Sequence, residues 1–100
     1  SEQLPYLIFT KAMDFVTVYD QRSLESKKIR LEGPQAWAFI CCNEAPKSVG
    51  QIREYFREKM GEDPEDNLVE NTIAYLEEKG LLYGERKKYL NLALPHNSNL

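Results

Sequence analysis

Apolar residues alternate with polar ones over the first third of the chain, and this pattern predicts β-strands. A short apolar run, 6–9, forms the first candidate. The segment 15–19 is rich in β-forming residues, with Phe15 and Tyr19 on one face and its two valines on the other. The polar stretch 20–27 then serves as a loop before a third strand.

The third candidate strand, 28–31, alternates cleanly, with Ile29 and Leu31 inward and Lys28 and Arg30 outward. A three-stranded sheet has two edge strands, and an exposed edge offers unpaired N–H and C=O groups to which an extended peptide can add. The outward basic residues would equally protect that edge from aggregation. From the pattern, the two interpretations have similar weight.

The period of the pattern changes after Gly33. Pro34 suits the first position of a helix, where its missing N–H group costs nothing. The helix 34–42 is apolar on nearly every side, so we expect it to be buried. Ser48 and Gln51 match a capping box that begins a second helix. That helix spans about 49–60, and its core face carries Val49, Ile52, Phe56 and Met60.

A third helix is predicted to begin at Asp63, which would cap it, with Pro64 in the first position. Glu65 and Asp66 would then favour the helix dipole. Gly80 ends the helix as a left-handed residue. The apolar stripe of this helix consists of Val69, Thr72, Ile73 and Leu76.

The segments 81–83 and 89–94 flank a turn that starts at Gly84-Glu85, and they predict a hairpin. Alternate leucines indicate one buried face: Leu90, Leu92 and Leu94, which alternate with Asn91 and Ala93. The order β-β-β-α-α-α-β-β predicts an α+β, winged-helix-like fold. We expect a single domain over 1–100, ordered from about 5 to 95. The first residue, Ser1, suits a domain cut from a larger protein.

Charge conflicts with a DNA-binding role for such a fold. The segment 62–79, which contains the third helix, has seven acids against one base, a net charge of −6. Contacts from Lys and Arg to phosphate dominate affinity for DNA, so an acidic helix disfavours entry into a groove. The whole chain has net charge −3 and an acidic second half, which disfavours nucleic acid and anionic membranes. The basic run 86–88 at the hairpin tip would contact phosphate or, equally, prevent self-pairing of the hairpin.

Candidate catalytic and metal sites are weak. The adjacent Cys41 and Cys42 fall on a helix, and zinc sites or disulfide frameworks need more, spaced cysteines. We expect a reduced pair with at least one member in the core, and therefore a cytoplasmic protein. The single histidine, His96, lies in a polar tail, which removes the usual general base. We expect no catalytic residue, metal site or membrane span in this segment.

Short motifs occur in an order that resembles one family. They are Val16-Thr17-Val18-Tyr19-Asp20, Ile29-Arg30-Leu31-Glu32-Gly33, an Ala36-containing helix, Gly80-Leu81-Leu82 and Tyr89-Leu90-Asn91-Leu92-Ala93-Leu94-Pro95. Together they cover most of the chain and resemble the C-terminal domain of cobalamin-binding radical SAM enzymes that mature ribosomally made peptides. That domain is similar to the winged-helix-like peptide-recognition modules typified by the leader-binding chaperone of pyrroloquinoline quinone biosynthesis.

The resemblance implies a peptide-binding site between the third strand and the third helix. In modules of this type a leader peptide adds to the strand and lies against the helix. Carried over to this chain, the implicated residues are Lys28, Ile29, Arg30 and Leu31 on the strand, with Asn67, Glu70, Asn71 and Ala74 on the helix. The acidic helix would prefer a peptide with some positive charge.

The resemblance also implies a larger parent enzyme with an iron–sulfur cluster, S-adenosylmethionine and cobalamin, none of them bound by this segment. Nothing in the chain resembles the three-cysteine motif of such enzymes. We therefore expect a non-catalytic accessory domain whose partners are a leader or substrate peptide and the remaining domains of the parent. The alternatives are a winged-helix DNA-binding transcription regulator and a purely structural assembly domain.

Overall fold

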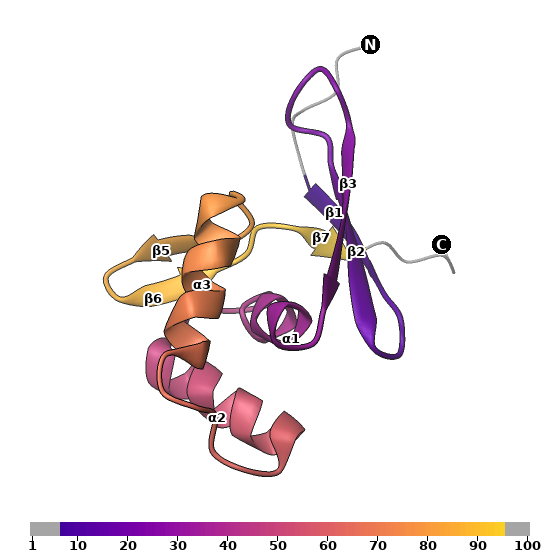
Figure 1. The fold of residues 1–100 in the computed structure, drawn as a ribbon. Coiled ribbons are helices and arrows are strands. Elements are labelled where there is room, and N and C mark those ends of the chain that lie inside the picture. Colours follow the sequence, from indigo (N-terminus) through magenta and orange to yellow (C-terminus); the bar gives the residue numbers. More distant parts are fainter. Residues whose placement is uncertain (1–6, 96–100) are drawn as a thin grey trace.

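The computed structural model describes residues 7–95 as an α+β domain, which confirms the expected fold class (Figure 1). Its main elements are β1 (Leu7–Lys11), β2 (Phe15–Asp20), β3 (Lys27–Glu32), α1 (Pro34–Cys41), α2 (Val49–Met60), α3 (Leu68–Glu78), β5 (Tyr83–Glu85) and β6 (Lys88–Leu90). Two short strands, β4 (Lys47–Ser48) and β7 (Leu94–Pro95), were not expected. Tyr6, which we placed in the first strand, and His96 lie outside the described residues.

The larger sheet has four strands in the order β3-β2-β1-β7. β1 and β2 are antiparallel, as are β2 and β3, whereas β7 runs parallel to β1. All three helices lie on one side of this sheet (Figure 1). β4, β6 and β5 form a second, smaller sheet, of which the β5–β6 hairpin is the wing.

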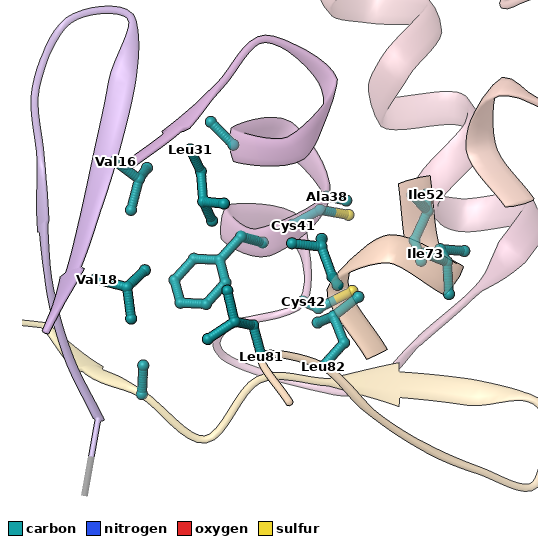
Figure 2. Close-up of a cluster of buried hydrophobic side chains, with 14 of the residues drawn as sticks. Val16, Val18, Leu31, Ala38, Cys41, Cys42, Ile52, Ile73, Leu81 and Leu82 are labelled. Atoms are coloured by element: carbon teal, nitrogen blue, oxygen red, sulfur yellow. The ribbon is translucent and has the colours of Figure 1, made fainter. Parts of the chain in front are cut away.

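α1 occupies the centre of the molecule, as its apolar sequence predicts. Phe39 is fully buried and meets Phe9 of β1 edge-on, with ring centroids 5.4 Å apart. Trp37 makes the same kind of contact with Phe56 of α2, also at 5.4 Å. Figure 2 shows side chains of the sheet turned toward α1, namely Val16, Val18 and Leu31. The helix therefore joins the sheet to α2 and α3.

α2 begins with the predicted capping box. The Gln51 N–H group donates to the Ser48 hydroxyl at 3.2 Å, and the Ser48 N–H group donates to the Gln51 side chain at 2.9 Å. Gly61 ends the helix in the left-handed conformation, with φ 77°. The start of this helix was thus correctly placed from sequence.

The predicted start of the third helix was wrong. α3 begins at Leu68, and its N-cap residue is Asn67, which has φ 74° and makes no side-chain capping hydrogen bond. Asp63 instead lies 3.3 Å from Arg57 of α2, and Pro64 is buried in the loop before the helix. α3 ends as predicted. The N–H group of residue 80 donates to the carbonyl of residue 77 at 2.9 Å, and that of residue 81 donates to the carbonyl of residue 76 at 2.8 Å.

The predicted face of the last strand was also wrong. β6 ends at Leu90, and beyond it Asn91 and Ala93 are buried (2% and 4% exposed) while Leu92 and Leu94 are exposed (68% and 60%). The cause is the hydrogen bonding of Asn91, described below. Gly84 and Glu85 belong to β5, and the turn itself is made by the two residues after them.

Among residues 7–95, no helix combines the length and the apolar character needed to cross a membrane.

Candidate peptide-binding site at the edge of the sheet

β3 is an edge strand among residues 7–95, because within this range its neighbour in the sheet is β2 alone. The register pairs Leu31 with Val16 and Ile29 with Val18. Lys28 and Arg30 are exposed, Ile29 is half-buried and Leu31 is fully buried. The inward and outward assignments made from the sequence are therefore confirmed.

The phase of the hydrogen-bond ladder identifies the free backbone groups of β3. The Ala12 N–H group donates to the Phe15 carbonyl at 2.9 Å, so Phe15 points its backbone groups toward β1. Because inward and outward pairs alternate along an antiparallel strand, Val16 and Val18 point theirs toward β3. The register then directs the backbone groups of Leu31 and Ile29 back to β2. The backbone N–H and C=O groups of Arg30 and Lys28 therefore face the open edge of the sheet.

Arg30 is held in place on the outer face of the sheet. Its guanidinium carbon lies 3.8 Å from the centroid of the Phe15 ring, which is a cation–π contact. Its Nε is 2.6 Å from a carboxylate oxygen of Glu32. The Arg30 charge is therefore already engaged, whereas within residues 7–95 no carboxylate lies within 4.0 Å of the Lys28 ammonium.

The four helical candidates, Asn67, Glu70, Asn71 and Ala74, are all exposed. Their spacing places them on one exposed face of the helix, with Glu70 at one border of that face and Asn71 at the other. Glu70 lies 3.8 Å from Arg53 of α2, and Glu77, seven residues later, lies beside Gly84 of the wing. This side of α3 therefore faces α2 and the wing. The placement of Glu70 in a site beside β3 is not supported by this orientation.

A different side of α3 faces the sheet. Leu68, Asn71 and Tyr75 are three or seven residues apart and so share a side of the helix. Leu68 and Tyr75 are half-buried against the core, and Asn71 is exposed. In Figure 1 the wing lies on one side of α3, with α1 and β3 on the other. We missed Leu68 and Tyr75 in the sequence, although their spacing carried the signal.

Arg22, in the loop after β2, ties the sheet to the end of α3. It donates from Nη1 to the Gly80 carbonyl at 2.9 Å, and from Nε and Nη2 to the two Asp20 carboxylate oxygens, each at 2.9 Å. The hydrogen bond from Arg22 holds the pKa of Asp20 below its usual value, against the opposing effect of burial. No local pattern could indicate this contact, because 58 residues separate Arg22 from Gly80.

Cys41 and Cys42 are free and both buried, which confirms that at least one of them belongs to the core. The pKa of Cys42 is raised, first by its hydrogen bond with Cys41 and then by burial, whereas that hydrogen bond lowers the pKa of Cys41. Cys41 lines a surface pocket of about 540 Å³ together with Lys47, whose ammonium donates to the Cys41 carbonyl at 2.9 Å. Among residues 7–95, no group of three or more His, Cys, Asp or Glu is arranged to hold a metal ion.

The structure thus joins β3 to α3 by two connections. Both elements pack against α1, and Arg22 links the loop before β3 to Gly80, just beyond the end of α3. The arrangement has an open strand edge on one side and a partly apolar helix flank on the other. Comparison of this chain with protein-family models, with curated proteins and with solved structures gave no match.

Proposed function

We propose that this chain is a non-catalytic peptide-recognition domain that holds an extended peptide by strand addition to β3. The observation that carries the proposal is the open edge of β3, where the backbone groups of Lys28 and Arg30 have no partner strand among residues 7–95. An added strand would satisfy these groups and could place alternate side chains against α3. The half-buried Ile29, Leu68 and Tyr75 offer apolar surface for such contacts.

The motif order described above supports a parent of a particular class, a radical SAM enzyme that matures ribosomally made peptides. In such a parent the domain would retain the leader peptide, so that the core of the peptide reaches the active site at high effective concentration. Iron–sulfur, S-adenosylmethionine and cobalamin chemistry would belong to other domains of the parent. The free cysteines are compatible with a cytoplasmic location.

The proposal is tested by titrating the isotopically labelled domain with peptides encoded near its gene and following backbone NMR shifts. We expect the largest shifts along 27–32 and on the Leu68, Asn71 and Tyr75 side of α3. Shifts that avoid both elements, or no shifts at all, would contradict the proposal.

A pair of variants tests strand addition itself. Arg30→Pro removes a backbone N–H group that faces the open edge and leaves the β2–β3 ladder intact, because an edge strand tolerates proline at such a position. Arg30→Val removes the same side chain but keeps the N–H group. We expect Arg30→Pro to weaken binding about tenfold more than Arg30→Val. Equal affinities would show that the peptide does not pair with this edge.

A further inference from the structure

We infer, on the basis of the proposed function, that the peptide added to β3 carries carboxylate side chains at alternate positions and apolar side chains between them. The inference rests on how charge is distributed over the two faces of β3. Lys28 and Arg30 both project from the outer face, and Ile29 and Leu31 belong to the inner face.

Register determines which peptide residues meet these side chains. Because Lys28 and Arg30 direct their backbone groups to the open edge, they form the hydrogen-bonded positions of a ladder with an added antiparallel strand. Peptide residues opposite them project from the same outer face, with Cα atoms about 5.5 Å away. Opposite charges attract across such a pair, and like charges repel. A carboxylate at each of these positions therefore complements the row of basic side chains.

Lys28 is the stronger determinant of this preference. Arg30 already contacts Glu32 at 2.6 Å and the Phe15 ring at 3.8 Å, so part of its charge is compensated. Within residues 7–95, no carboxylate is closer than 4.0 Å to Lys28. The neighbouring residue of β2 in register with Lys28 is the uncharged Tyr19.

The inner face of β3, which faces the helices, favours apolar rather than charged peptide side chains. The peptide residue opposite Ile29 projects toward the side of the sheet that carries the helices, beside a half-buried isoleucine. Leu31, next on this face, is fully buried. An unpaired charge placed here would lose hydration without a partner. An apolar side chain would instead cover the exposed part of Ile29.

The acidic charge of α3 does not oppose a carboxylate on the outer face. Glu70 and Glu77 are directed to Arg53 and to the wing, away from β3. The sheet itself lies between α3 and its own outer face (Figure 1). The net charge of −6 in 62–79 therefore excludes DNA more effectively than it selects the peptide, and the expectation of a positively charged peptide is replaced.

The test is selection from a displayed random-peptide library against the full chain at low salt. Selected peptides are then assayed against Lys28→Glu, against Lys87→Glu as a control of equal charge change at the wing tip, and against Arg30→Pro and Arg30→Val. We expect enrichment of Asp and Glu at alternate positions. We also expect about a fivefold loss of affinity in Lys28→Glu, reduced by salt, and no loss in Lys87→Glu.

The outcomes separate the two proposals. One outcome is that selected peptides bind Arg30→Pro more weakly than Arg30→Val yet lack Asp or Glu at alternate positions. That result would overturn the inference and leave strand addition supported. Peptides insensitive to Arg30→Pro, or a selection without any binder, would overturn both. An equal loss in Lys28→Glu and Lys87→Glu would show that only net charge matters and would also overturn the inference.

Discussion

Asn91 satisfies polar groups left open where α1 ends. Its side-chain amide donates to the Phe39 carbonyl at 2.6 Å, and its own N–H group donates to the Cys42 carbonyl at 2.9 Å. Its amide oxygen accepts from the Asn43 side chain at 2.9 Å and from the Ala93 N–H group at 2.8 Å. A buried asparagine is stable here because each of these groups is paired.

Asn91→Ala should therefore lower the free energy of unfolding by about 2–3 kcal/mol, because it removes the side-chain partner of the Phe39 carbonyl and of the Ala93 N–H group. Urea denaturation measures the loss. Leu92→Ala, the adjacent exposed position, is the matched control and should change stability by less than about 0.5 kcal/mol. The reverse order of the two effects would contradict the assignment of buried and exposed faces.

Cys41 should react with a thiol reagent before Cys42 in the folded protein. Cys41 lines a surface pocket, and its pKa is lowered by the hydrogen bond with Cys42 and by Lys47. The pKa of Cys42 is raised, and its side chain is fully buried. Since the thiolate is the reactive form, labelling of Cys41→Ser near pH 8 should be several-fold slower than labelling of Cys42→Ser. Similar rates in the native state would contradict this difference.

At the scale of single elements, the wing has a favoured type of hairpin turn built from unfavourable residues. Arg86 and Lys87 connect β5 to β6 with φ of 56° and 63°, a left-handed pair that is strongly favoured only for Asn and Gly. Gly84 meets a separate constraint, because a Cβ atom there would lie 2.7 Å from the Tyr89 ring. The basic turn therefore costs local stability.

The double variant Arg86→Asn/Lys87→Gly should raise the free energy of unfolding by about 1 kcal/mol, because it relieves two left-handed residues. Thermal unfolding monitored by circular dichroism measures the gain. Lys88→Gly, at a strand position with ordinary geometry, should destabilise the wing and serves as the control. A gain in the control but not in the double variant would contradict the assignment of the turn.

Sequence patterns predicted the elements whose causes are local. The capping box at Ser48 and Gln51 gave the start of α2, and the alternation about Ile29 gave the faces of β3. The start of α3 was wrong, because a cap pattern read from sequence does not fix where a helix begins: Asp63 contacts Arg57 instead, and the N-cap is Asn67. The burial of Asn91 was missed because its partner Phe39 lies 52 residues away.

In the candidate site, too, features with local causes could be predicted and features set by distant contacts could not. The edge position of β3 and the outward direction of Lys28 could be predicted, since both follow from period and strand order. The spacing of Leu68 and Tyr75 indicates a shared, partly apolar side of α3, but the direction of that side relative to the sheet could not be predicted, since it depends on the tertiary neighbours of Glu70 and Glu77. Charge counted along a helix says little about charge presented to a site.

At the scale of the whole molecule, the Asp20–Arg22–Gly80 connection fixes the sheet relative to α3 and should give stability a specific pH dependence. The pKa of Asp20 is lowered in the folded state, so its contribution is fully present above the unfolded pKa of about 3.9 and is lost as pH falls through the folded value. Asp20→Asn should therefore cost about 1 kcal/mol at neutral pH and progressively less below about pH 4.

Chemical denaturation of the protein and of Asp20→Asn between pH 7 and about pH 2 measures this difference. Glu32→Gln is the control, because the Arg30–Glu32 pair is exposed on both sides (59% and 62%) and should contribute little at any pH. A cost of Asp20→Asn that stays constant down to the lowest pH would contradict the linkage. Arg22→Lys keeps the charge but not the fork that binds Asp20 and Gly80 together, so it should also weaken peptide binding if the connection positions β3 beside α3.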